Sequence, residues 1–305
     1  MSLVIPCRDK NDPKLKDLLK SIEAQDFPKS EMETLVITEG TSESAKAIGI
    51  RKACGEVIGI LASDNEFTDN LFLSYTWEAL HYYRTHCAYP AYYTYKKKDD
   101  ALNRYFSLIG GNDVLSLYLG KNDRRPCWAD SQKIIEIMGF QYSIPSLGDN
   151  GFFILRESIL KSDLNNYSHI DACEDLRHKF HPLTALVMYS QDIWHKTGGN
   201  IFKFFAKRYR YGLQHAFNPN RRWHLVDFSK PRDIWRLAWF IFVTLTVIEP
   251  LCLSVRGYLK IRDAAWFLHW PICVLTLFTY ALLVINLGIK RLFQSLSVPM
   301  AVRRA

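Results

Sequence analysis

The residues best suited to chemistry follow an apolar run in the first quarter of the chain. The stretch GEVIGILASDNEF, residues 55–67, reads as a buried strand that ends at Ser63, Asp64, Asn65 and Glu66. Ligands of α/β sheets bind at the carboxyl ends of the strands, so polar and acidic groups at a strand tip indicate a ligand crevice. Taken without its surroundings, Ser-Asp-Asn is also typical of a polar turn that caps a helix, which is the alternative to a ligand site.

Three later groups also have the residue types that contact or transform a ligand. They are Gly148-Asp149-Asn150-Gly151, the adjacent acids Glu174 and Asp175, and His195. Each has an ordinary structural alternative. Asp-Asn-Gly is a common turn, and acids at a helix start are favourable charges beside the helix dipole. His195 follows a short apolar segment, and a lone histidine usually has no special role.

Alternating strands and helices must position these groups. Apolar runs at 2–6, 32–38 and 56–62 predict strands, and residues 14–25 and 43–54 have the spacing of helices. Short apolar strands separated by helices predict an α/β fold with a doubly wound, mostly parallel sheet. Residues 67–200 are mixed and aromatic-rich, and they show no repeat.

Composition limits the compartment and the partners. The 305 residues can bury a substantial core, and 39 Lys and Arg against 31 Asp and Glu give a net charge of +8. That balance favours an anionic partner such as a nucleotide, a phosphate or a membrane surface. The seven cysteines are scattered without a C-x-x-C pair, which indicates a reducing compartment. The N-terminus has no basic leader, so we expect the chemistry to start in the cytosol.

Two long apolar segments near the end of the chain predict a membrane hairpin. Residues 237–255 hold one acid, Glu249, and residues 265–289 hold no Asp, Glu, Lys or Arg. Two buried helices of a soluble core are the alternative, and Glu249-Pro250 makes the first span imperfect. More cations flank the pair than lie between the spans, so we expect both ends in the cytosol. The flanking cations are Arg221, Arg222, Lys230, Arg232, Arg236, Lys290, Arg291, Arg303 and Arg304.

Four motifs together resemble one enzyme family. SLVIPCRDK, ESAKAIGIRKACGEVIGILASDN, SLGDNGFFILRES and CEDLRHKF are similar to the family 2 inverting glycosyltransferases of GT-A fold, over about residues 2–215 with gaps. In that family, a strand-terminal acidic motif binds a divalent cation that carries the diphosphate of a sugar nucleotide. Mg²⁺ and Mn²⁺ suit such a site because they take hard oxygen ligands. Ala62 departs from the family pattern, since it stands where the first acid is usual.

The resemblance assigns expected roles to particular residues. Asp175 would be the general base that takes the acceptor hydroxyl proton, with Glu174 orienting the acceptor or a loop. Asp64 and His195 would bind Mg²⁺ or Mn²⁺. The acceptor would contact Gly148, Asp149, Asn150 and Gly151. The donor would contact Pro6, Arg8, Asp9, Glu39, Lys46, Ser63 and Asp64.

These expectations define a membrane-bound enzyme. Residues 1–225 would form the GT-A domain, divided into a nucleotide-sugar half (1–100) and an acceptor half (101–225). Residues 226–305 would anchor it to a plasma, inner or internal membrane through helices at about 237–257 and 265–289. The partners would be a UDP- or GDP-linked sugar and a lipid-linked acceptor, with a homo-oligomer left open.

Three other functions compete with this one. A polyprenyl-phosphate glycosyltransferase has an acceptor that is already an anion and needs no base, so the Glu-Asp pair favours a hydroxyl acceptor. Loss of the first acid at Ala62 leaves open a non-catalytic scaffold of transferase fold. A nucleic-acid or phospholipid binder would not require acids at the strand end, and no ordered basic-aromatic repeat supports nucleic-acid binding.

Overall fold

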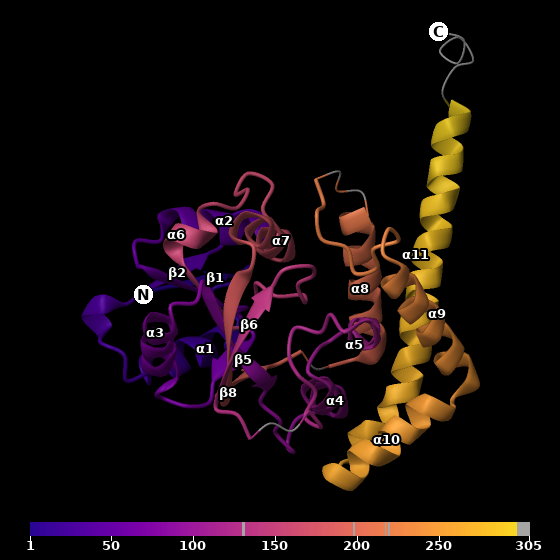
Figure 1. Ribbon diagram of the computed structural model, residues 1–305, viewed down its shortest axis with the longest axis horizontal. Helices are drawn as coiled ribbons and strands as arrows, with labels where there is room; N and C mark the ends of the chain where they lie inside the picture. Colours follow the sequence, from indigo (N-terminus) through magenta and orange to yellow (C-terminus); the bar gives the residue numbers. More distant parts are fainter. Residues whose placement is uncertain (130–131, 198, 217, 219, 298–305) are drawn as a thin grey trace.

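The computed structural model has an α/β fold. Its mixed β-sheet has a group of long helices on one side (Figure 1). It describes residues 1–129, 132–197, 199–216, 218 and 220–297, with side chains for all of these except 215, 216 and 290–297. Arg303, Arg304 and the side chains of Lys290 and Arg291, which entered the expected topology, therefore lie outside the described part. The strands are β1 (Ser2–Pro6), β2 (Glu33–Ile37), β3 (Val57–Ile60), β4 (Asn65–Phe67), β5 (Cys87–Tyr93), β6 (Ile135–Phe140), β7 (Phe152–Leu155) and β8 (Leu183–His195).

The sheet is mixed, and most of its strands share one direction. Among the described residues the order is β2-β1-β3-β7-β5-β8-β4, with β6 also paired to β8. Strands β1, β2, β3, β5 and β8 run one way, whereas β4, β6 and β7 run antiparallel to their neighbours. The three strands predicted from sequence are present, and the α/β class is confirmed.

Helices cover both faces of the sheet because strand side chains alternate between two apolar cores. Val4 points into a core completed by α2 and α7, whereas Leu3 and Ile5 point into one completed by α1 and α3. Helix α1 begins where the Asp12 side chain accepts the Lys14 backbone N–H. The helices around the sheet are α1 (Pro13–Glu23), η1 (Lys29–Glu31), α2 (Ser42–Lys52), α3 (Phe72–Tyr83), α6 (Arg156–Ile159) and α7 (His169–Phe180).

A third apolar core joins helices from distant parts of the chain. It contains Tyr105, Leu115, Phe240 and Trp266, so residues on both sides of the boundary expected at 225 share it. The division into domains stays a prediction. The helices of this core and around it are α4 (Ala101–Ile109), α5 (Val114–Leu119), α8 (Ile201–Ala216), α9 (Pro231–Thr246), α10 (Ile248–Lys260), η2 (Ala264–Leu268) and α11 (His269–Ser297).

The first of the two expected spans is broken. Helices α9 and α10 meet at an angle of 83°, and Val247 between them has a φ of 66°. The segment Ala264–Ile289 is long and apolar enough to cross a membrane. The bent pair of α9 and α10 is long and apolar enough only if the two helices together form one span. The membrane hairpin is therefore not established.

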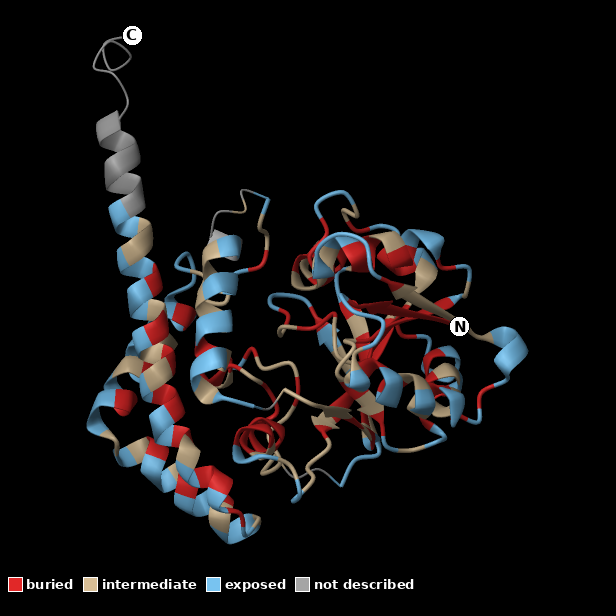
Figure 2. Cartoon of the chain, turned by 180° about the vertical axis from the view of Figure 1, so that it is seen from behind, coloured by how far each residue is buried: buried red, intermediate tan, exposed pale blue. Residues whose placement is uncertain are grey.

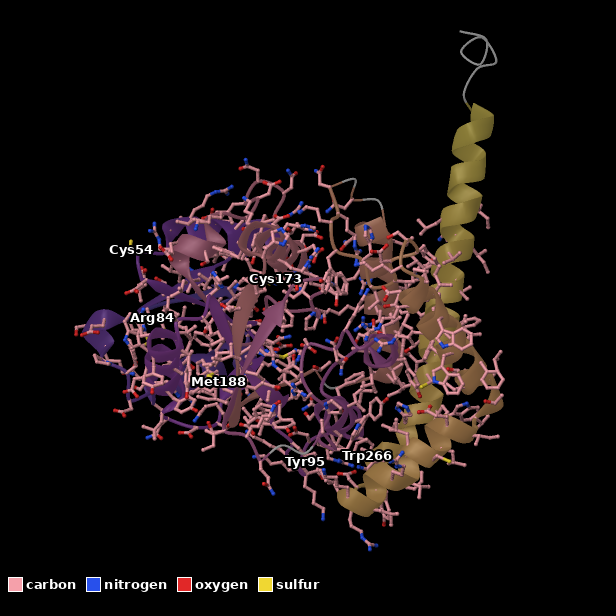
Figure 3. All side chains as sticks on the ribbon, viewed as in Figure 1. Cys54, Arg84, Tyr95, Cys173, Met188 and Trp266 are labelled. Atoms are coloured by element: carbon pink, nitrogen blue, oxygen red, sulfur yellow. The ribbon has the colours of Figure 1, made fainter. Side chains whose placement is uncertain are left out.

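The cysteines are dispersed through the molecule. All seven cysteines are free. Figure 3 places Cys54 at the outer surface and Cys173 in the interior, far from each other. The same view shows Tyr95, which follows β5, near Trp266 of η2, and both pack into the third core.

Candidate functional site

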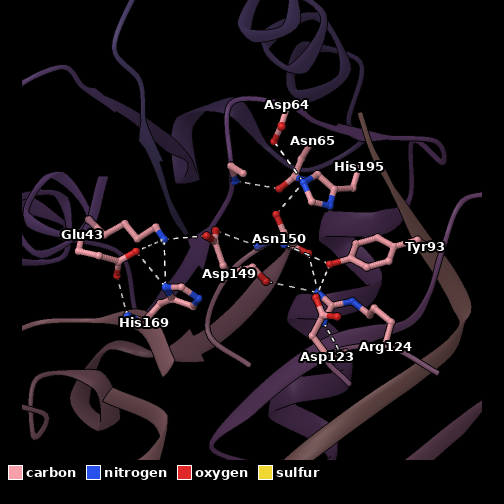
Figure 4. Close-up of polar contacts among 12 residues, drawn as sticks. Glu43, Asp64, Asn65, Tyr93, Asp123, Arg124, Asp149, Asn150, His169 and His195 are labelled. Atoms are coloured by element: carbon pink, nitrogen blue, oxygen red, sulfur yellow. Dashed lines mark hydrogen bonds and ion pairs between the residues drawn. The ribbon is translucent and has the colours of Figure 1, made fainter. Parts of the chain in front are cut away.

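Strand pairing brings Asp64 and His195 together. Strand β4 starts at Asn65 and pairs antiparallel with the end of β8, so that Asn65 lies opposite His195. The preceding residue, Asp64, then faces the histidine, with its Oδ1 3.5 Å from Nε2 (Figure 4). The Lys196 backbone N–H donates to the Asp64 carbonyl at 2.9 Å and fixes this juncture.

The charge state of Asp64 suits a cation ligand. Burial acts to raise its pKa, but the charge and hydrogen bond of His195, with weaker contributions from Lys14 and Lys207, bring the pKa to about 2. The carboxylate is therefore ionised at neutral pH. Its side chain remains 27% exposed, so a ligand can reach it.

The two side chains fit part of a divalent cation site. The Thr197 hydroxyl lies 3.1 Å from Nδ1 of His195, which leaves Nε2 as the nitrogen that faces Asp64. The described residues contain no cluster of three or more His, Cys, Asp or Glu that would form a complete protein site. A carboxylate and an imidazole can still hold Mg²⁺ or Mn²⁺ when a substrate diphosphate supplies further oxygens.

Asn65 stabilises the turn in which the usual first acid is absent. Its side chain is fully buried, and its Oδ1 accepts the Ala62 backbone N–H at 2.8 Å. Its own backbone N–H donates back to the Ala62 carbonyl at 3.0 Å. Because these bonds need nothing from the side chain at 62, alanine there leaves the turn intact.

The glycine-containing loop lies beside this turn. The φ angles of Gly148, Asn150 and Gly151 are 110°, 57° and 81°, so the loop has the left-handed backbone that glycine and asparagine tolerate. A Cβ at Gly148 would approach the His169 carbonyl oxygen to 2.4 Å. The Asn150 side chain accepts from Asn65 Nδ2 at 3.3 Å, which links the loop to the strand tip.

Lys46 of α2 anchors the same loop. Its side chain is only 1% exposed, and its Nζ lies 2.6 Å from Asp149 Oδ2, 3.0 Å from Glu43 Oε1 and 3.4 Å from His169 Nδ1. Burial alone would lower the pKa of Lys46, but Asp149 and Glu43 outweigh it and raise that pKa. The sequence assigned Lys46 to the donor and Asp149 to the acceptor, and the structure joins them in one partly buried ion cluster.

Three residues of the network were given no role from sequence. Tyr93 donates from its hydroxyl to Asp123, accepts from Asn150 Nδ2 at 3.1 Å, and packs its ring 5.3 Å from that of His195. Arg124, which is buried, donates to the Asn150 carbonyl at 2.6 Å. Asp123 and Arg124 follow the short helices α4 and α5, and the sequence suggested only an acceptor-side position for them, without a derived role.

The cavities near this network are small. The hollow against Tyr93, Gly111 and His195 is too narrow to admit a water molecule. Ligand pockets usually begin at roughly 300 Å³. A larger hollow of about 850 Å³ lies elsewhere, between α3 and β6, and contains none of the network residues. We assign the site from the polar network, because the larger hollow carries no metal-binding pair.

The Glu-Asp pair lies outside this network. Asp175 Oδ1 is 2.6 Å from Nε of Arg222, and its Oδ2 accepts the Asp163 backbone N–H at 3.2 Å. Glu174 accepts two hydrogen bonds from Arg177, at 2.9 and 2.6 Å. Both acids are thus held by arginines, and their catalytic roles stay predictions.

The remaining residues predicted for the donor lie in loops after β1 and β2. Pro6 ends β1 opposite Ile37 of the parallel strand β2, so the loops that follow leave the same edge of the sheet. Arg8, Asp9 and Glu39 in these loops are exposed. Ser63, next to Asp64, is half-buried at the third strand end. Their contacts with a donor stay predictions.

Comparison with known proteins gives a likeness of fold. No family model and no curated protein matches the sequence. The mannosyltransferase PcManGT from Pyrobaculum calidifontis, solved with GDP-Man and Mn²⁺, is similar over 93% of this chain and 87% of its own, at 9% identity and a TM-score of 0.50. S. aureus TarS 1-349 in complex with UDP is similar over 83% and 74%, at 11% identity and a TM-score of 0.43. The chain thus shares its overall fold with a glycosyltransferase.

Proposed function

We propose that this protein is a metal-dependent inverting glycosyltransferase of family 2 type. It moves a sugar from a UDP- or GDP-linked donor to a hydroxyl of a lipid-linked glycan or glycolipid at the cytosolic face of a membrane. The observation that carries the proposal is the Asp64–His195 pair at a strand end, in a fold shared with a mannosyltransferase solved with GDP-Man and Mn²⁺.

Each part of the site has a role in this proposal. Asp64 and His195 hold Mg²⁺ or Mn²⁺, which would neutralise charge on the departing diphosphate. The loop of Gly148, Asp149, Asn150 and Gly151 presents the acceptor, and its backbone is preorganised by Lys46 and Arg124. The donor base and ribose contact Pro6, Arg8, Asp9 and Glu39 at the neighbouring strand ends.

The proposal is tested by donor binding and by turnover. Thermal shift with a set of sugar nucleotides and Mn²⁺ identifies the donor, because a ligand that binds only the folded state raises the melting temperature. Transfer from the radiolabelled donor to lipid extracts then measures activity. Wild-type protein that binds a donor and transfers nothing is a scaffold, and the enzyme proposal fails.

A specific observation also favours a polyprenyl-phosphate acceptor. A phosphate acceptor needs no base, and Glu174 and Asp175 are both bound to arginines in this structure. Asp175→Asn separates the two acceptors. A hydroxyl acceptor requires the base, so turnover falls by roughly 10²–10⁴-fold, whereas transfer to a phosphate stays within a few fold. Arg222→Lys, which keeps a positive charge beside Asp175, is the matched control.

A further inference from the structure

The three C-terminal helices have an inverted distribution of polarity. Helices α9, α10 and α11 turn apolar side chains to the outside, while several polar side chains of α11 and α10 face the protein. The outward set, which we call the outer face, comprises Ile234, Trp235, Trp239, Phe242, Leu245, Ile248, Leu251, Val255, Leu259, Trp270, Val274, Phe278, Leu282, Val284, Ile285 and Ile289. A water-exposed helix has the opposite pattern.

Hydrogen bonds fasten α11 to the body along much of its length. Near its start, His269 Nδ1 lies 2.7 Å from the Tyr105 hydroxyl. Farther along, the Tyr280 hydroxyl donates to Asp113 Oδ2 at 2.5 Å. Farther still, Asn286 Nδ2 donates to the Tyr209 hydroxyl of α8 at 2.6 Å. The attached stretch is thus about 18 residues, or roughly 27 Å at 1.5 Å per residue.

This attachment conflicts with a perpendicular crossing by α11. The attached length nearly equals the roughly 30 Å hydrocarbon thickness of a bilayer. Helix α8 packs beside the same stretch, since a Cβ at Gly212 would touch Leu283. A crossing there would draw α8 into the hydrocarbon, together with its exposed cations Lys203, Lys207 and Arg210. Charged side chains inside the membrane are strongly disfavoured.

We propose that α9, α10 and α11 lie along the membrane surface, with the outer face sunk into one leaflet and both ends of α11 on the side of the sheet. The three helices lie together at the edge of the molecule away from the sheet (Figure 1). Figure 2 shows exposed residues recurring along all three. Trp235, Trp239 and Trp270 belong to this face, and tryptophan favours the lipid interface. The partner of the outer face is therefore lipid.

Thiol labelling tests the placement without any need for turnover. The full chain carries Cys54→Ser and Cys252→Ser, which remove its exposed thiols. One reporter is then added per variant at Lys203→Cys, Arg262→Cys or Ser297→Cys, in sealed vesicles with the sheet outward. All three should react equally with an impermeant maleimide before detergent is added. A reporter that reacts only after detergent, at 262 for a hairpin or at 297 for a single span, overturns the proposal.

Vesicle flotation tests the outer face itself. The double variant Trp239→Ser with Leu251→Ser should bind vesicles of phosphatidylcholine and phosphatidylglycerol about tenfold less than wild type. Tyr82→Ser is the matched control, because Tyr82 on α3 is 80% exposed and lies outside the outer face. Unchanged flotation of the double variant, or a stable dimer in lipid-free buffer that buries this face, contradicts the proposal. Neither result bears on donor transfer.

Discussion

At the scale of single residues, the site depends on a pairing that sequence spacing does not show. Asp64 and His195 were each predicted as metal ligands from a family resemblance. Their closeness comes from the antiparallel pairing of β4 with the end of β8. Tyr93 and Arg124 could not be predicted in the same way, because their roles consist of contacts with the loop at 148–151. Local patterns predict elements, whereas such contacts depend on the tertiary fold.

Asp64→Asn should abolish most of the activity and leave the fold intact. The amide keeps the shape of the side chain and removes the charge that would hold the proposed cation. We expect kcat/KM to fall by at least about 100-fold with donor and Mn²⁺. The melting temperature without ligand should change little. Asp26→Asn, at an exposed position outside the polar network, is the control. Equal activity of the two variants would contradict the assigned site.

Glu43 makes stability depend on pH. Burial acts to raise the pKa of Glu43, but His169 and Lys46 outweigh it and hold the pKa well below its usual value. Ionised Glu43 therefore stabilises the fold fully above the pKa of glutamate in the unfolded chain, about 4.3. This stabilisation disappears as pH falls toward the lower pKa of Glu43 in the folded protein. The difference in unfolding free energy between wild type and Glu43→Gln should shrink between pH 6 and pH 3 in urea titrations. The exposed Glu23→Gln serves as the control, and parallel curves for Glu43→Gln would refute this role.

At the scale of elements, the first third of the chain was predictable and the middle was not. Strands β1, β2 and β3 follow apolar runs whose period matches a buried sheet. Strand β7 inserts antiparallel between β3 and β5, which no local pattern indicates. Glu249-Pro250 made the first expected span imperfect, and the structure breaks the helix at Val247. Pro250 falls in the first turn of α10, where its missing N–H costs little.

The loop at 148–151 requires glycine at its first position. An added Cβ at Gly148 would meet backbone, and its φ of 110° disfavours any other residue. We expect Gly148→Ala to lower the unfolding free energy by about 2 kcal/mol or more and to reduce transfer. A Cβ added at Gly288 in α11 would have no neighbour within 4 Å, so Gly288→Ala should be neutral or slightly stabilising. Chemical denaturation in detergent measures the unfolding free energy of both variants, and equal losses of unfolding free energy would contradict the prediction.

The bend between α9 and α10 contains a strained residue. Val247 is β-branched, and its φ of 66° lies in the left-handed region. Val247→Gly should therefore stabilise the protein by about 1 kcal/mol, because glycine adopts this backbone without a steric cost. The measurement is the unfolding free energy in detergent, with Val243→Gly as the control inside α9. A loss of stability in Val247→Gly would indicate that the bend needs the valine side chain.

At the scale of the whole molecule, net charge and exposed apolar surface both contribute to the proposed membrane binding. A net charge of +8 would attract the chain to an anionic membrane, and the outer face would add apolar area whose contribution salt does not screen. Helix α8, which packs against α11, contributes exposed cations. An attraction of this kind acts over about 10 Å at 0.1 M salt and fades at higher ionic strength.

Membrane binding should therefore have two components that salt separates. With vesicles that contain phosphatidylglycerol, raising the salt from about 0.05 to 0.5 M shortens the screening length, so affinity falls by about tenfold or more. With pure phosphatidylcholine, affinity is lower and nearly independent of salt, because only the outer face contributes. Lys203→Gln with Lys207→Gln should reduce the salt dependence on anionic vesicles and leave neutral vesicles unaffected. Salt that releases the protein completely from both vesicle types would show that charge alone holds it there, and the apolar outer face would then need another explanation.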